Sequence, residues 1–337
     1  MRRVVWFPAL AVAAGIVLTP VAAGAWGNTG HRLIGTLAVR TLPPEVPAFL
    51  RGEAAAGEMG ELAREPDRTK GAGKIHDSNR DPAHFIDLDD QGRVLGGPVF
   101  TELPPTRADY ETALRAAGTD SWKAGYLQYS IVDGYQQLVK DFAYWRAAAA
   151  AEKRARGERK AWLRKDRIRR ERLIFADLAS FAHYVGDGAQ PLHVTVHYNG
   201  WGDYPNPDGY TTDRIHGPFE GAFVKGAVTA EGARAAMTPF ASCGCSIETR
   251  TLAYLQRTGT QVEPLYRLWG EGAFRPGQTR GAEFATARVG AGASELRDLI
   301  VEAWRESARA RVGWPAVSVA DVEAGAVDPY DALLGDD

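Results

Sequence analysis

Apolar residues recur at helical spacing along most of this chain, and few stretches alternate in the way that a strand does. The helices that this spacing predicts cover residues 30–42, 52–65, 109–148 with breaks near Gly118 and Gly125, 147–187 as one long helix or two joined ones, and 281–311 as one or two more. The only candidate strands are residues 84–89 and 92–100. No internal repeat or Pro/Ser-rich linker divides the chain, so the pattern predicts a single, mainly α-helical domain.

The first 25 residues follow a different pattern. A short positive segment, Met-Arg-Arg, precedes the apolar run VVWFPALAVAAGIVLTPVAAGA, which ends in Ala23-Gly24-Ala25. This small-x-small ending is typical of a signal-peptide cleavage site. We therefore expect a secretory signal peptide over residues 1–25 and a mature domain over 26–337 that is periplasmic or secreted. Since no second apolar span follows, we expect no transmembrane segment in the mature chain.

The balance of charges indicates no particular partner. The chain has 40 Lys and Arg against 42 Asp and Glu, a formal net charge of -2. One segment, Lys153 to Arg172, is basic and resembles a nucleic-acid-binding stripe. Acidic residues are interspersed in it, which favours a solvated helix face over such a stripe.

Three of the seven histidines lie in the short stretch FAHYVGDGAQPLHVTVHYNGW. His183 and Asp187 are four residues apart in a predicted helix, so they project from one face and could bind the same divalent cation. His193 follows after a turn. A single pair of this kind is more often a core histidine beside a surface aspartate.

The same arrangement recurs further along, where His216 and Glu220 are also four residues apart. His84 and His31 extend the set of imidazoles. Imidazole and carboxylate together suit zinc. The two cysteines, Cys243 and Cys245, lie elsewhere and suit a local disulfide in an oxidising compartment. A site of nitrogen and oxygen ligands leaves room for a bound water, which is the catalytic pattern.

These residues form an ordered series: Trp26-x4-His31, an aspartate, His84, His183-x3-Asp187-x5-His193 and His216-x3-Glu220. In this series the chain resembles the S1/P1 nuclease family, which shares its fold with zinc-dependent phospholipases C. The resemblance covers most of the mature chain. It implies a helical phospholipase C/P1 nuclease-like fold with a trinuclear zinc site, and therefore three Zn²⁺ per chain, at the base of a cleft.

The resemblance also implies the ligands. They would be Trp26, through its free α-amine and backbone carbonyl, together with His31, His84, His183, Asp187 as a bridge, His193, His216 and Glu220. Cleavage before Trp26 would free that α-amine, whose proton the metal would displace. The remaining ligand is an upstream aspartate. Asp67 in Glu65-Pro66-Asp67 matches best, where the family has Trp-Ala-Asp, and Asp77 and Asp81 are alternatives.

The activity that the resemblance implies is zinc-dependent hydrolysis of single-stranded DNA or RNA, or of nucleotides, by a metal-bridging hydroxide. Asp67 would take part in the catalytic centre. A nearby cation, Arg68 or Lys70, would offset charge on the phosphoryl oxygens. Phe85 would stack on a base, with Asp87 as its hydrogen-bonding partner, although Phe85 suits core packing equally well. No stable protein partner is implied.

Two features depart from the nuclease pattern. Glu220 replaces the usual aspartate and resembles the phospholipase C branch. The loop over residues 197–216 lacks the Gly-Gly-Asn segment of the nucleases, and we expect it to line the cleft. Its aromatic residues, Tyr198, Trp201, Tyr204 and Tyr210, suit stacking on bases, contact with a lipid headgroup or simple packing. We expect His197 to lie near the cleft without binding metal. The spacing from Trp26 to His31 and the long interval from His193 to His216 are nuclease-like. A nuclease is favoured, with a phospholipase C or a non-catalytic zinc protein as alternatives.

Overall fold

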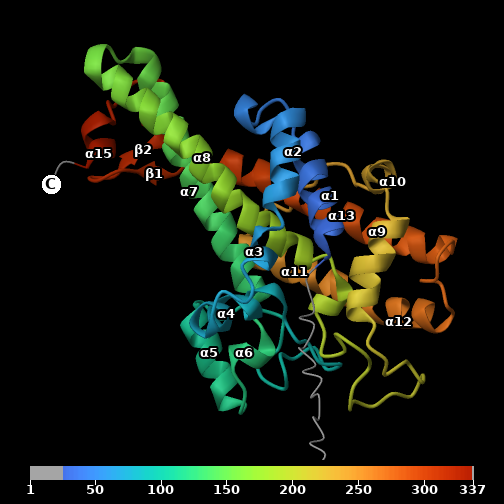
Figure 1. Cartoon of the computed structure of the whole chain (residues 1–337). Helices are drawn as coiled ribbons and strands as arrows, with labels where there is room; N and C mark the ends of the chain where they lie inside the picture. Colours follow the sequence, from blue (N-terminus) through green and yellow to red (C-terminus); the bar gives the residue numbers. More distant parts are fainter. Residues whose placement is uncertain (1–25, 336–337) are drawn as a thin grey trace, which may run out of the picture.

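The computed structural model describes residues 26–335, so the expected signal peptide lies outside the described residues. This part of the chain is mainly α-helical, as the sequence predicted (Figure 1). Its elements are α1 (Asn28–Arg40), η1 (Ala48–Leu50), α2 (Glu53–Leu62), α3 (Glu65–Arg68), α4 (Lys74–Arg80), η2 (Asp81–His84), α5 (Arg107–Ala116), α6 (Ser121–Ala124), α7 (Leu127–Arg154), α8 (Gly157–Asp187), η3 (Pro191–His193), η4 (Pro218–Phe223), α9 (Val224–Ala227), α10 (Ala230–Ala235), α11 (Ile247–Gly259), α12 (Val262–Gly270), α13 (Thr279–Ser307), β1 (Arg311–Val312), β2 (Val317–Ser318), α14 (Val319–Ala324) and α15 (Tyr330–Leu334).

The long helices α7 and α8 pack side by side as an antiparallel hairpin, one end of which projects from the body of the molecule (Figure 1). The sequence left open whether residues 147–187 form one helix or two, and the structure has two. Helix α7 ends at Arg154 because Ala155 and Arg156 are extended. Gly157 then begins α8 with a φ of 57°, a conformation that glycine adopts at little cost.

Helix α1 lies between α2, α8 and α13. Its residues Ile34, Leu37 and Ala38 are buried, at the spacing that places them on one face of a helix. His31 lies one turn before Ile34 on that same face and is completely buried. The apolar stripe that docks α1 in the core therefore also carries His31 into the interior.

The two predicted strands are wrong. Residues 84–89 and 92–100 form isolated bridges only, such as Leu88 with Val94. The second of these stretches turns sharply, with positive φ values at Gly92, Leu95 and Gly96. These turns interrupt the ladder before it extends. Within the described residues, the only paired strands are β1 and β2, which run antiparallel.

The C-terminal segment packs against the hairpin. Val319 and Val322 of α14 are buried in a small second core together with Ala143 and Ala147 of α7. Elsewhere, Cys243 and Cys245 form the local disulfide that the sequence suggested. Within residues 26–335, no helix combines the length and the hydrophobicity needed to cross a bilayer.

Candidate metal centre

The last turn of α8 carries the first part of the centre. His183 and Asp187 are both completely buried, and as i and i+4 residues they face the same way. The helix ends at Asp187, and a short turn leads into η3, which ends at His193. This turn brings His193 Nδ1 to 3.8 Å from Asp187 Oδ1.

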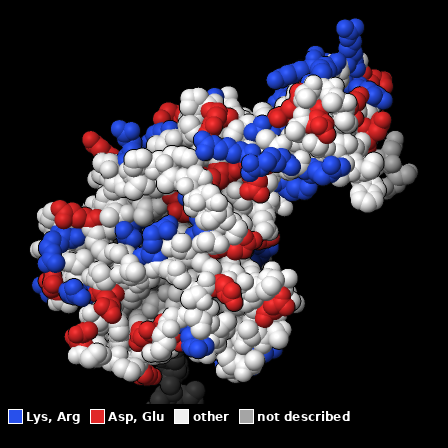
Figure 2. Space-filling model, turned by 180° about the vertical axis from the view of Figure 1, so that it is seen from behind, with Lys and Arg blue, Asp and Glu red and all other residues white. Residues whose placement is uncertain are grey.

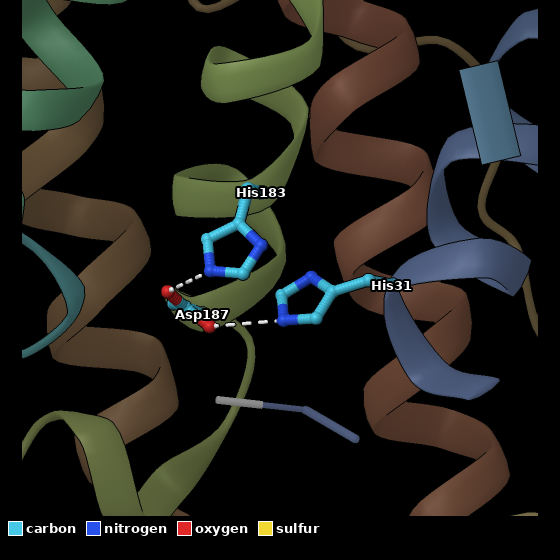
Figure 3. A group of neighbouring side chains, drawn as sticks. All are labelled: His31, His183 and Asp187. Atoms are coloured by element: carbon cyan, nitrogen blue, oxygen red, sulfur yellow. Dashed lines mark ion pairs between the residues drawn. The ribbon is translucent and has the colours of Figure 1, made fainter. Parts of the chain in front are cut away.

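The carboxylate of Asp187 contacts imidazoles from two helices (Figure 3). Its Oδ2 lies 3.3 Å from His183 Nε2, and its Oδ1 lies 3.4 Å from His31 Nε2. The two imidazole rings stack, with their centroids 3.8 Å apart. The ligand atoms of these three residues lie within 4.8 Å of one another, so they could hold one metal ion.

A second group shares His183 with the first and adds Asp67 and His84. His84 comes from η2, and its Nδ1 lies 2.9 Å from His183 Nε2 and 3.1 Å from Asp187 Oδ2. Asp67 comes from α3, and its Oδ1 lies 3.8 Å from His183 Nε2. Asp187 therefore lies against both groups, in the position that a bridging carboxylate requires.

The structure distinguishes the three candidate aspartates. Asp67 joins the second group, whereas Asp77 pairs with the neighbouring His76 at 2.9 Å. Asp81 lines the adjacent pocket but belongs to none of the groups found among the described residues. Of the alternatives that the sequence left open, Asp67 is the one brought to the imidazoles.

A third group consists of His193, His216 and Glu220. The Nε2 atoms of the two histidines are 3.1 Å apart, and Glu220 Oε2 lies 2.9 Å from His216 Nε2 and 3.6 Å from His193 Nε2. The expected helix between His216 and Glu220 is present: His216 and Gly217 are α-helical and continue into the π-helical η4. Gln190, which the sequence did not reveal, donates to Glu220 Oε2 at 3.1 Å and is fully buried.

Backbone carbonyls orient two of the imidazoles. His183 Nδ1 lies 2.9 Å from the carbonyl oxygen of Ala63, and His193 Nδ1 lies 2.6 Å from that of His84. Because a carbonyl only accepts, each Nδ1 donates its proton, and each Nε2, once deprotonated, can present a lone pair to its group. This is the tautomer that carbonyls in the outer shell commonly impose on metal-binding histidines.

Buried polar atoms without hydrogen-bond partners are a second reason to expect divalent cations in these groups. Buried polar atoms normally have hydrogen-bond partners, yet several here have none among the described residues. They are His31 Nδ1 and Nε2, His84 Nε2, His216 Nδ1 and Asp187 Oδ1. Of these, His31 Nε2 and Asp187 Oδ1 face each other at 3.4 Å. A cation between them would satisfy both atoms, and nitrogen and oxygen donors of this kind suit zinc.

Electrostatics keeps most of these ligands in the form that a metal requires. Burial lowers the pKa of His183 well below its usual range and also lowers the pKa of His84, which favours neutral imidazoles. Burial alone would raise the pKa of Asp67, but His183 and Lys70 outweigh it and lower that pKa to about 2. For His193, burial opposes but Asp187 and Glu220 raise the pKa to about 9, so metal binding must release that proton.

A pocket of about 530 Å³ opens onto ligands from the second and third groups. Trp122, 53% exposed, stands in its wall beside Lys123, and the sequence signalled neither, because α6 is too short for a periodic pattern. Of the four aromatic residues in the loop over residues 197–216, Tyr198 alone lines this pocket. His216, at the end of that loop, lines it as well. The full lining is Lys70, Asp81, His84, Phe85, Asp87, Leu95, Trp122, Lys123, Leu192, His193, Tyr198 and His216.

Of the two basic residues expected to offset phosphoryl charge, Lys70 rather than Arg68 lies beside the metal groups. Its Nζ lies 2.6 Å from Asp67 Oδ1, and its side chain lines the pocket. Arg68 is 57% exposed and pairs with Glu65 at 2.7 Å, away from the pocket lining.

Phe85 and Asp87 both line the pocket immediately after the ligand His84. The carboxyl group of Asp87 is buried, and burial raises its pKa well above the usual range. A protonated Asp87 can donate a hydrogen bond as well as accept one. The placement of the two residues suits the base-binding roles that the sequence suggested for them.

Trp26 lies at the start of the described chain, next to the ligands. Its ring is fully buried and packs on Phe219, and its Nε1 donates to the carbonyl oxygen of Gly186 at 2.8 Å. The following residue, Gly27, is so close to the backbone of Glu220 that an added Cβ would lie 3.0 Å from its carbonyl oxygen. The backbone of Trp26 is thereby fixed between the neighbour of Asp187 and the third group.

The two remaining histidines lie outside the three groups. His197 is buried, stacks on Trp201 and contacts Trp201 O at 2.7 Å and Asp90 Oδ1 at 2.8 Å. His76 pairs with Asp77. Five of the seven histidines therefore converge on one region.

No protein-family model matches this chain, and no curated protein matches it either.

Proposed function

We propose that this chain is a zinc-dependent phosphodiesterase of the S1/P1 nuclease type that hydrolyses single-stranded nucleic acid. The observation that supports it most is the contiguity of the three imidazole and carboxylate groups. The first two share His183, and His193 of the third lies 3.8 Å from Asp187. Such an arrangement suits several ions acting on one phosphate group rather than isolated structural sites.

The residues divide into holders of metal and binders of substrate. Trp26 and the eight side chains of the three groups would hold the ions: His31, Asp67, His84, His183, Asp187, His193, His216 and Glu220. Zinc ions held there would supply a hydroxide nucleophile near neutral pH and neutralise charge on phosphoryl oxygens. Lys70, paired with Asp67, would place a positive charge at the pocket for a phosphoryl oxygen.

The walls of the pocket would hold the nucleotide. Phe85 and Trp122 offer aromatic faces, on which any base can stack. Asp87 would hydrogen-bond a base, and Lys123 would contact a phosphate outside the centre. A pocket of about 530 Å³ accommodates a nucleotide and leaves the rest of a strand outside.

The experiment is a release assay with the purified mature protein. Acid-soluble nucleotides should be released from single-stranded DNA or RNA, the release should stop in chelator, and zinc should restore it. Metal analysis should find about three zinc ions per chain, as the resemblance implies.

The assay also separates the alternatives. Glu220 in the third group favours a phospholipase C as the second candidate, and hydrolysis of a phosphatidylcholine analogue without nucleotide release would establish it instead. Zinc bound firmly with neither activity would identify a structural zinc protein.

A further inference from the structure

Positive charge is concentrated on the projecting hairpin of α7 and α8. From Glu152 to Arg172 there are 11 Lys and Arg against 4 Asp and Glu, a net formal charge of +7 in a chain whose total is -2. The rest of the chain therefore carries -9. Figure 2 shows Lys and Arg side chains along the part that projects from the body. A local field of one sign attracts polyanions even when the whole protein is slightly acidic.

The acidic residues interspersed in this segment neutralise only some of its cations. Glu152 and Glu171 pair with Arg167, and Asp166 pairs with its neighbours one helical turn on. Six exposed cations of the hairpin have side chains with no hydrogen bond or ion pair to any described residue: Lys153, Arg156, Lys160, Arg164, Lys165 and Arg172. Three of the four acidic residues in this segment thus pair with its own arginines, and these six cations are left without an acidic partner.

A groove of about 740 Å³ runs between the hairpin and the elements packed on it, α13 and α14. Lys153 from α7 and Lys160 from α8 both line it, and both are among the unpaired cations. The two acidic residues that line the groove are already paired, Glu152 with Arg167 and Glu323 with Arg146. The groove therefore offers free ammonium groups from both helices.

The surface around the groove suits the phosphate backbone of a nucleic-acid strand better than it suits a lipid bilayer. Insertion at a membrane surface requires a face of exposed apolar side chains. Among the described residues, the large apolar side chains exposed on the hairpin and its packed strands are Leu173 and Trp314 only. We propose that this groove and the unpaired cations around it bind the phosphate backbone of single-stranded nucleic acid. The choice of polyanion rests on the proposed function.

Because the groove is distant from the metal groups, its contribution to substrate binding depends on substrate length. Lys160 and His183 are 23 residues apart on one helix, which corresponds to roughly 35 Å at 1.5 Å per residue. A stacked strand rises about 3.4 Å per nucleotide, so about ten nucleotides separate the groove from the metal ligands. A dinucleotide reaches only one of the two places, whereas a longer strand reaches both.

The test is a binding titration with the zinc-loaded protein. The probe is a fluorescent single-stranded oligonucleotide of about 30 nucleotides with phosphorothioate linkages, which keep the backbone charge and slow hydrolysis. The double variant Lys153→Glu/Lys160→Glu should bind at least roughly tenfold more weakly at moderate salt. Its slope of log K against log salt should fall by about 1.4, which is about 0.7 for each phosphate that the variant no longer neutralises.

The matched control is Lys225→Glu/Arg234→Glu, which makes the same change in charge at two exposed residues of α9 and α10. It should bind the oligonucleotide as the wild type does, and the KM for a dinucleotide should be unchanged in both variants. Unchanged binding in the hairpin variant, or an equal reduction in the control, overturns the proposal. So does loss of binding to phosphatidylglycerol vesicles with oligonucleotide binding intact, which would identify a membrane surface. Oligonucleotide binding through the groove without any cleavage would instead count against the proposed function alone.

Discussion

His31 Nε2 lies 3.4 Å from Asp187 Oδ1, although the two residues are far apart in the sequence, on α1 and at the end of α8. Both side chains are fully buried. Unpaired polar atoms in such a place cost free energy unless something else satisfies them. A metal ion between the two residues would satisfy both atoms.

Asp187→Asn should lower the rate of nucleotide release by several orders of magnitude and reduce the zinc content. Asparagine has nearly the same shape but lacks the charge that a bridge between two cations requires. Metal analysis and the release assay measure the two effects, and circular dichroism checks that the helices are intact. A variant with full zinc content and a mild reduction in rate would show that Asp187 is not the bridge.

Asp67→Asn should weaken zinc binding, whereas Asp77→Asn should leave it unchanged. Asp67 faces His183 and Lys70, whereas Asp77 pairs with His76. We expect the metal affinity of Asp67→Asn to fall at least tenfold, by analogy with the removal of supporting groups at zinc sites, and Asp77→Asn to titrate with zinc as the wild type does. Equal reductions in the two variants would remove the reason for preferring Asp67.

An extra residue ahead of Trp26 should cripple zinc binding, whereas Trp26→Phe should keep it. The first change removes the α-amine from its place, whereas the second removes the hydrogen bond from Nε1 to Gly186 and part of the buried ring but leaves the α-amine where it is. Zinc stoichiometry of the two purified proteins is the measurement. Full zinc content in the extended protein would refute ligation by the α-amine.

Trp122→Ala should raise the KM for oligonucleotides without changing the zinc content. Removal of one stacking platform costs about 1–3 kcal/mol, which is roughly 5- to 150-fold. The half-exposed Trp122 belongs to none of the three metal groups, so its removal should leave kcat largely unchanged. The exposed Trp314→Ala, on the β1–β2 turn, is the control and should have no effect on KM for short substrates.

Asp141→Asn should stabilise the fold above neutral pH. Burial, and then the adjacent carboxyl of Asp177, raise the pKa of Asp141 to about 7. Because the folded state holds this proton more tightly than the unfolded state, the stabilisation is complete below the ordinary pKa near 4 and is lost as pH rises through 7. The amide should therefore raise Tm at pH 8 by on the order of 2 °C and have little effect at pH 4. An equal shift at both pH values would contradict this assignment.

Local pattern was sufficient for much of this protein. Apolar periodicity predicted the main helices, and i to i+4 spacing placed His183 beside Asp187 and His216 beside Glu220, because neighbours on a helix are fixed by its geometry. The apolar and polar pattern over residues 84–100 wrongly predicted two strands. Burial there follows the packing of turns at Gly92 and Gly96 rather than a pleated ladder.

Only the tertiary structure decided how these local pieces combine. It chose Asp67 over Asp77 and Asp81, because helix packing rather than sequence distance determines which carboxylate reaches His183. It placed Trp122 in the pocket wall, although no periodicity marks so short a helix. It also showed which cations of the hairpin have acidic partners, because pairing depends on side-chain contacts that composition does not contain. The sequence by itself determined which ligands and charges are present, and long-range packing determined which of them meet.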